Sequence, residues 1–164
     1  MRLIKWCVFC FVGLIDIGMI IGMASRLYEF HDDDPDRGAL LSGIDKFGAR
    51  FSRIAYLNQG WSAADSLWFY NTNQGSNLLP FSFFLMLEQA DSVNLFRDDR
   101  NIDRYGYLPQ RATTRNPNGL PVGMVKDEYQ GKAYMGFTCA ACHTTQINYD
   151  HIGIRIDGGP ANAD

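Results

Sequence analysis

Cys139-Ala-Ala-Cys-His143 is the stretch from which the fold and chemistry of this chain are best argued. A C-x-x-C-H run is the attachment signature of a c-type haem. Two thiols three positions apart on one turn can form thioethers with the two vinyl groups of one porphyrin, and the adjacent imidazole can bind its iron. The run therefore predicts one covalently attached haem c, with Cys139 and Cys142 binding the porphyrin and His143 ligating the iron.

Other kinds of site also use a C-x-x-C pair. A structural zinc site needs a second pair of ligands, and the two other cysteines, Cys7 and Cys10, lie in an apolar N-terminal run. A thioredoxin-like redox pair would follow a strand in a βαβ pattern, which the residues around the motif do not show. Because the chain has only 4 cysteines, a chance C-x-x-C-H is uncommon, and haem attachment is the favoured interpretation.

Residues 1–25 have the features of an export segment, either a signal peptide or a membrane anchor. Arg2 and Lys5 precede an apolar run from Trp6 to Ala24. Asp16 within this run would cost about 2.5–3.5 kcal/mol in a bilayer, which favours cleavage over anchoring. Because haem is joined to thiols outside the bacterial cytoplasm, we expect a periplasmic or secreted protein, or one anchored to the inner membrane through this segment.

Residues 26–45 are predicted to be a charged linker. They contain an acidic, breaker-rich cluster without periodicity, His31-Asp-Asp-Asp-Pro-Asp-Arg-Gly38. The whole chain has a net charge of −3, and 13 basic and 17 acidic side chains remain once residues 1–25 are set aside. Nucleic-acid binding calls for a basic surface, so we expect no nucleic acid among the partners.

The sequence after the linker contains two helix signals. Ser62 and Asp65 have the spacing of a capping box, which predicts a helix from Ala63 to about Asn71. Pro80 is a suitable first residue for a second helix over residues 81–89. Because that segment is apolar nearly all round, we expect the second helix to be buried.

The remainder is expected to be mostly irregular. Residues 91–126 show little periodicity and are predicted to form a long loop region, of the kind that often wraps a ligand. Apolar and polar residues alternate over 146–149 and 154–157, which predicts a β-hairpin. The expected fold class is mainly α with long loops and a small β-hairpin, that is, an incomplete cytochrome c-like haem domain over residues 46–164.

The sixth iron position would decide the function of such a domain. A Met or His ligand there makes an electron carrier, whereas an open position can bind peroxide or dioxygen. The 21 residues after His143 contain no methionine. Met135 lies too near the motif, Met86 lies in the helix expected to be buried, and His151 lies at the hairpin tip. We therefore assign no distal ligand. The candidates are Met86, Met124, Met135, His31 and His151.

Arg155, on the second strand of the predicted hairpin, is a candidate for binding a haem propionate. A guanidinium group matches a carboxylate in bidentate geometry. A salt bridge to Asp157 and a solvent-facing strand position are equally open alternatives.

The stretch from Gly60 to the end resembles the rubber-oxygenase-like (RoxA-type) cytochrome c proteins, relatives of the bacterial di-haem cytochrome c peroxidases. The resemblance covers about two thirds of the chain and is most specific around the haem motif. It implies a periplasmic or secreted protein with two c-type haems. This chain has a single C-x-x-C-H and so looks like the N-terminal piece of a longer protein. The matching segments are Asn58–Ser62, Phe69–Ser76, Tyr105–Pro109, Asn118–Gly123, Gly136–Thr144 and Arg155–Ala161.

Three functions follow from these observations. The leading hypothesis is covalent c-type haem binding and electron transfer in the periplasm, with a redox partner protein or a second haem domain as partner. The alternative is an enzyme, in which this segment carries the active haem of a di-haem peroxidase or dioxygenase with an open sixth iron site. In a third hypothesis the motif is incidental and the chain is a secreted binding module.

Overall fold

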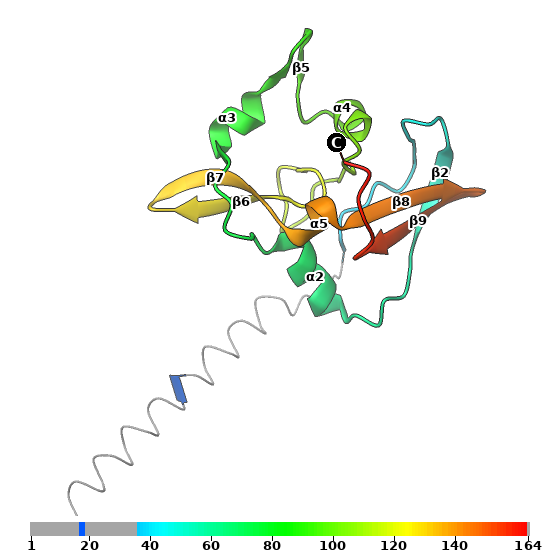
Figure 1. The fold of residues 1–164 in the computed structure, drawn as a ribbon, viewed down its shortest axis with the longest axis horizontal. Coiled ribbons are helices and arrows are strands. Elements are labelled where there is room, and N and C mark those ends of the chain that lie inside the picture. The colour runs from blue at the N-terminus through cyan, green and yellow to red at the C-terminus, as the bar shows by residue number, and fades with distance from the viewer. Residues whose placement is uncertain (1–16, 19–35, 164) are drawn as a thin grey trace, which may run out of the picture. The chain divides into compact units, whose positions relative to one another are not determined.

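The computed structural model describes residues 17–18 and 36–163. The chain divides into two compact units, Met1–Pro35 and Asp36–Asp164, and the fold in Figure 1 is described here for the second unit. Except for positions 17–18, the predicted export segment lies outside the described residues. The second unit begins at Asp36, so residues 36–45 of the predicted linker belong to it.

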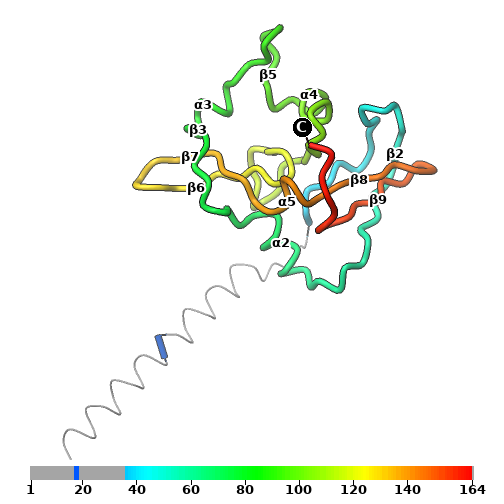
Figure 2. Tube along the Cα trace, viewed as in Figure 1, coloured from blue at the N-terminus to red at the C-terminus, as the bar shows by residue number. Residues whose placement is uncertain are grey.

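The larger sheet has four strands in the order β1-β2-β9-β8. The strands are β1 (Gly43–Ile44), β2 (Arg50–Tyr56), β8 (Thr144–Tyr149) and β9 (His151–Asp157). β2 and β9 are parallel, while the other two pairs are antiparallel. Figure 2 shows that this sheet brings the beginning of the unit and its end side by side.

The second sheet has three antiparallel strands in the order β3-β7-β6. They are β3 (Leu79–Pro80), β6 (Met124–Tyr129) and β7 (Lys132–Phe137). β6 and β7 form a hairpin whose two turn residues, Gln130 and Gly131, have φ values of 50° and 73°. Positive φ at both positions is the type I′ geometry that matches the twist of paired strands.

Four short helices and one small ribbon complete the unit. The helices are α2 (Ala63–Asn71), α3 (Phe81–Met86), α4 (Asp99–Arg104) and α5 (Cys139–Cys142), and the ribbon pairs β4 (Glu88–Gln89) with β5 (Ser92–Leu95). The capping-box prediction is confirmed: Ser62 Oγ accepts from Asp65 N at 3.1 Å, and Asp65 Oδ2 accepts from Ser62 N at 2.9 Å.

The prediction of a mainly α fold is wrong, because the described part of the chain is a mixed α/β structure. Among its helices only α2 has seven or more residues, and the larger sheet is curled. The predicted hairpin is present as β8 and β9, but β2 and the β6–β7 hairpin were not foreseen. The β6–β7 hairpin was not predicted because its turn, Gln130-Gly131, lacks the Asn-Gly or Asp-Gly pair that is typical of a type I′ hairpin.

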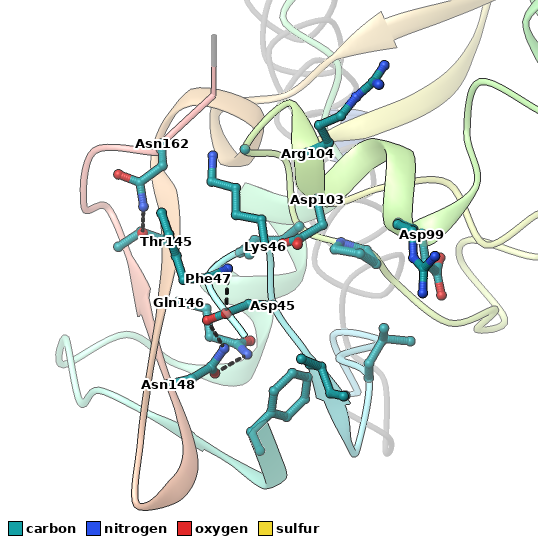
Figure 3. A pocket seen from close by; sticks show the side chains of 18 of the residues that line it. Asp45, Lys46, Phe47, Asp99, Asp103, Arg104, Thr145, Gln146, Asn148 and Asn162 are labelled. Carbon is teal, nitrogen blue, oxygen red and sulfur yellow. Dashed lines mark hydrogen bonds between the residues drawn. The ribbon is translucent and has the colours of Figure 1, made fainter. Parts of the chain in front are cut away.

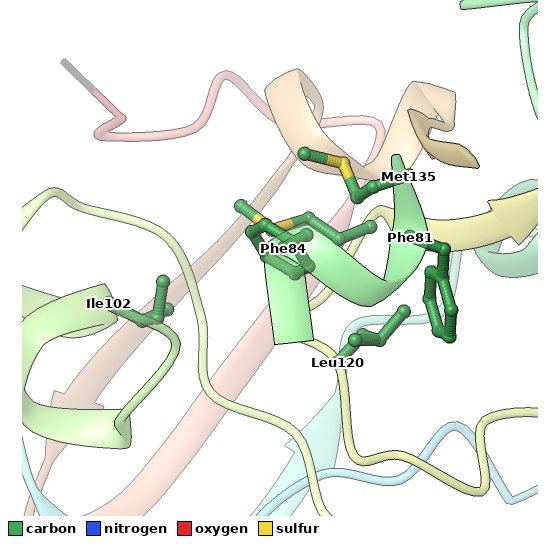
Figure 4. Close-up of a cluster of buried hydrophobic side chains, with 6 residues drawn as sticks. Phe81, Phe84, Ile102, Leu120 and Met135 are labelled. Carbon is green, nitrogen blue, oxygen red and sulfur yellow. The ribbon is translucent and has the colours of Figure 1, made fainter. Parts of the chain in front are cut away.

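The segments expected to be a buried helix and a long loop also differ from the prediction. α3 ends at Met86, and Phe83 and Met86 are 52% and 68% exposed, so this helix lies on the surface with one buried face. Residues 91–126 contain β5, α4 and the start of β6 rather than a loop throughout. Figure 4 shows the core that α3 and α4 cover, which consists of Phe81, Phe84, Ile102, Leu120, Met124 and Met135.

Candidate haem-attachment site

The motif forms a single helical turn, α5, between β7 and β8. Thr138 caps it, because its hydroxyl accepts from Ala140 N at 3.2 Å, and His143 ends it with a backbone N–H that donates to Cys139 O at 3.0 Å. Both alanines are good helix formers. The turn therefore places the two thiols at its first and last positions, with His143 directly after them.

Small buried residues allow α5 to pack closely against the neighbouring backbone. Ala140 and Ala141 are 1% and 3% exposed, and Thr138 is fully buried. A Cβ added to Gly123, which has a φ of 80°, would lie 2.0 Å from Ala141 N, so only a glycine permits this approach of the two backbones. Gly123 O also accepts from Thr138 N at 2.8 Å. The motif backbone is thereby fixed to the loop before β6.

The end of β9 holds the other side of the motif. Gly158 N donates to His143 O at 2.7 Å, and Ala161 N donates to Cys142 O at 2.9 Å. These two bonds satisfy carbonyl groups that the short helix leaves without internal partners. The segment after β9 then reaches Gly106, where an added Cβ would lie 1.8 Å from Asn162 O.

The reactive side chains of the motif differ in exposure, because Cys139 packs against the buried cluster that contains Phe69, Tyr70 and Val122. Both thiols are free, Cys139 is half-buried, and Cys142 and His143 are exposed. Burial raises the pKa of the Tyr107 phenol, and the charge of Cys142 acts in the same direction. Tyr107 also stacks on Phe137 with ring centroids 6.1 Å apart. One half-buried thiol, one exposed thiol and an exposed imidazole on a single turn form a donor set that fits a c-type haem.

Arg155 is buried rather than solvent-facing, with 2% of its surface exposed. Its Nε and Nη2 donate to Gln146 Oε1 at 3.2 and 2.8 Å, whereas its buried Nη1 has no partner. The carboxylate of Asp157 accepts instead from Arg37 Nη1 and, at 2.6 Å, from the Tyr70 hydroxyl. Arg155 therefore forms no salt bridge with Asp157 and does not face solvent. Its binding of a haem propionate stays a prediction.

Two tyrosines complete this buried polar cluster. Burial raises the pKa of Tyr70 far above its ordinary value, with the neighbouring Asp157 acting in the same direction. Burial also raises the pKa of Tyr56, whose ring lies 3.7 Å from the Arg37 guanidinium carbon. Both phenols therefore stay neutral in the folded protein at neutral pH.

A pocket of about 590 Å³ opens beside the larger sheet (Figure 3). Arg155, Thr145 and Gln146 line it from β9 and β8, and Asp103 and Arg104 line it from α4. Its volume is typical of small-molecule sites. The cysteines of the motif and His143 do not line it, so the structure does not bring Arg155 and the three motif residues into one pocket. The sequence pattern alone gave no signal for this cavity.

The candidate sixth ligands are widely separated. Met124 and Met135 are each 4% exposed and belong to the core, which leaves them no access to an iron outside it. His151 lies at the far end of the β8–β9 hairpin, about 20 Å from the motif end at the usual rise per residue. Met86 is exposed. His31 lies outside the described residues.

Residues 17–18 and 36–163 contain no group of three or more His, Cys, Asp and Glu side chains placed to hold a metal ion. In the same residues, no helix has the length and apolar character needed to cross a membrane.

Comparison with known proteins gives one distant relative. The chain is similar to "Uncharacterized protein y4iJ" of Sinorhizobium fredii, with 28% identity over 137 residues. The match covers 70% of this chain but 22% of the relative, so the chain spans about a fifth of that protein's length. No family model matches the chain. No solved structure matches it either.

Proposed function

We propose that this chain binds one haem c covalently through Cys139 and Cys142, with His143 on the iron, and takes part in electron transfer in the periplasm. The observation that carries the proposal is the arrangement of α5, whose backbone is fixed while Cys142 and His143 are exposed. The resemblance to the rubber-oxygenase-like cytochromes is consistent with it and remains a prediction.

The residues around α5 have separate tasks in this proposal. Cys139 and Cys142 supply the two thiols for the thioethers, and His143 supplies the imidazole. Gly123 and Ala141 hold the backbone of the turn in place. Phe137, two residues before Cys139, stacks on Tyr107 and offers apolar ring surface. The bound haem would supply one-electron redox chemistry.

Haem staining of a denaturing gel tests the attachment. The chain is produced together with a c-type cytochrome maturation system, and we expect a band that stays stained after denaturation. The double variant Cys139→Ser/Cys142→Ser should lose the stain completely. A matched variant, Cys7→Ser/Cys10→Ser, removes the same number of thiols outside the motif and should keep it. An unstained wild-type band from cells that mature a control cytochrome would refute the proposal.

A second candidate function is the active-haem segment of a peroxidase or dioxygenase. It is favoured by the positions of the candidate sixth ligands: among the described residues Met124 and Met135 are in the core and His151 is distant. Exposed Met86 remains available to the electron-carrier hypothesis. An iron with one protein ligand keeps a position for an exogenous ligand.

Carbon monoxide binding separates the two functions. A ferrous spectrum that carbon monoxide leaves unchanged would favour the electron carrier. If Met86→Leu then binds carbon monoxide, Met86 is the sixth ligand. Rapid carbon monoxide binding by the wild-type protein would favour the enzyme. In that case Met86→Leu should bind carbon monoxide at the wild-type rate.

A further inference from the structure

Arg155 lines the pocket of Figure 3 and carries a guanidinium group that no carboxylate neutralises. Arg155 is 2% exposed, and no ion pair joins it to any carboxylate in the described part of the chain. Its Nη1 has no hydrogen-bond acceptor, although the other two nitrogens share Gln146 Oε1. Leaving a buried charged donor without a partner is costly, so this group is built to receive an acceptor.

The nearby carboxylates are already engaged by other donors. Asp157 accepts from Tyr70 and Arg37, as described above. Asp45, which lines the pocket, accepts from the backbone N–H groups of Phe47 and Ala49 and, at 2.7 Å, from Asn148 Nδ2. Neither acid is free to turn toward Arg155. An acceptor on a ligand bound in the pocket would satisfy the Nη1 group of Arg155.

The remaining lining indicates what kind of acceptor fits. Much of the wall is apolar, formed by Leu40, Ile44, Phe47, Phe51, Leu108 and Pro109. Asp99 and Asp103 lie on the α4 side of the pocket, and two further negative charges disfavour a dianion such as phosphate. A ligand with one carboxylate and an apolar body could bond to the Arg155 guanidinium and pack against the apolar wall.

We propose that this pocket binds a monocarboxylate with an apolar body and that Arg155 holds the carboxylate. The carboxylate could come from a free organic acid or from a propionate at the edge of the haem. Both sources present the same chemistry to the guanidinium. The binding of a free acid does not depend on haem attachment, so the test below remains decisive even if the chain carries no haem.

Calorimetric titration with sodium hexanoate tests the proposal on the full chain, with and without haem. Hexan-1-ol has the same apolar body without the charge, and inorganic phosphate has charge without the apolar body. We expect saturable hexanoate binding to the haem-free chain, at least about tenfold tighter than either control probe. If the haem-loaded chain also binds hexanoate, the source is a free acid; if it does not, a propionate fills the site.

Substitution of two arginines in the same pocket locates the binding residue. Arg155→Gln should weaken hexanoate binding at least about tenfold, because the charge-assisted bond is lost. Arg104→Gln removes the same charge from an exposed position of the same pocket, where solvent screens it, and should change the affinity by less than about threefold.

Because Arg155→Gln could also unfold the sheet, the wild-type protein supplies a second measurement. The guanidinium NMR signals of Arg155 should shift in proportion to hexanoate occupancy and should not respond to hexan-1-ol. Signals that stay fixed while hexanoate saturates the protein would overturn the proposal. Absence of saturable hexanoate binding to the haem-free chain, or equal affinity for hexan-1-ol, would overturn it as well.

Discussion

Helix α5 and strand β9 are joined by a backbone hydrogen bond just beyond their ends, but they bury opposite kinds of side chain. α5 buries two alanines and leaves Cys142 and His143 exposed. β9 buries Arg155 and Asp157 and satisfies most of their polar atoms with side chains from other elements. A reactive turn can thus be fixed by close backbone packing, whereas a buried charged strand depends on a network of partners.

The largest effect should come from breaking the close packing under α5. Gly123→Ala places a Cβ 2.0 Å from Ala141 N, and backbone cannot move aside cheaply. We expect a loss of about 5 kcal/mol or more in the free energy of unfolding, measured by denaturant titration. Gly131→Ala is the control, because Gly131 also has a positive φ but open space around it, and it should cost about 1–2 kcal/mol. Equal losses in the two variants would contradict this account of α5.

The second effect concerns the network around β9. Asp157→Asn removes the nearly buried negative charge with which the Arg37 guanidinium pairs. The expected loss in the free energy of unfolding is about 3–5 kcal/mol. Glu128→Gln, in the exposed pair with Lys126, should change it by less than about 1 kcal/mol. A loss for Asp157→Asn no greater than that control would show that the network contributes little.

A smaller effect is expected at Tyr70, which donates one hydrogen bond to the same carboxylate. Tyr70→Phe should lower the free energy of unfolding by about 1–2 kcal/mol, and the loss should not add to that of Asp157→Asn, since both changes break one contact. The measurement is a double-mutant cycle by chemical denaturation. Full additivity would place Tyr70 outside the network.

The pH dependence of the same variant sharpens the comparison. Because burial raises the pKa of Tyr70, the phenol of the unfolded chain ionises above about pH 10 while that of the folded chain does not. The wild-type protein should therefore lose stability as the pH rises through this value. Tyr70→Phe should lose less over the same range, and identical alkaline profiles would contradict the assignment.

The smallest effect is expected at the start of α2, where the capping hydrogen bonds between Ser62 and Asp65 are exposed. Hydrogen bonds from Ser62 hold the pKa of the Asp65 carboxyl below its usual range. The stabilisation is complete above the unfolded pKa and is lost as the pH falls through the lower folded value. Ser62→Ala should therefore lower the melting temperature slightly at neutral pH, and the difference from wild type should shrink in acid.

Local signals in the sequence were sufficient for some elements. The Ser62–Asp65 box gave the helix Ala63–Asn71 with its bounds, and strict alternation gave the β8–β9 hairpin. Both patterns depend only on neighbours a few residues apart. The pairing of β2 with β9 joins residues about a hundred positions apart, with a shift in register at Phe51 and Arg53, and has no local signature.

The same distinction applies to the candidate site. The motif residues could be named from their spacing, but the role of Gly123 as the support of α5 depends on a contact that spacing does not reveal. The sequence makes Arg155 a candidate for binding a carboxylate, whereas its burial and its bond to Gln146 follow from the pairing of β8 with β9. The exposure of Met86 was missed because an all-apolar segment gives no preferred buried face.

The most direct test of the central claim is the mass of the peptide that contains residues 139–143. The chain is matured with a competent cytochrome assembly system, digested and analysed by tandem mass spectrometry. We predict that this peptide carries the mass of one haem, with both Cys139 and Cys142 modified. A peptide at its bare mass, with two unmodified thiols, would contradict the account.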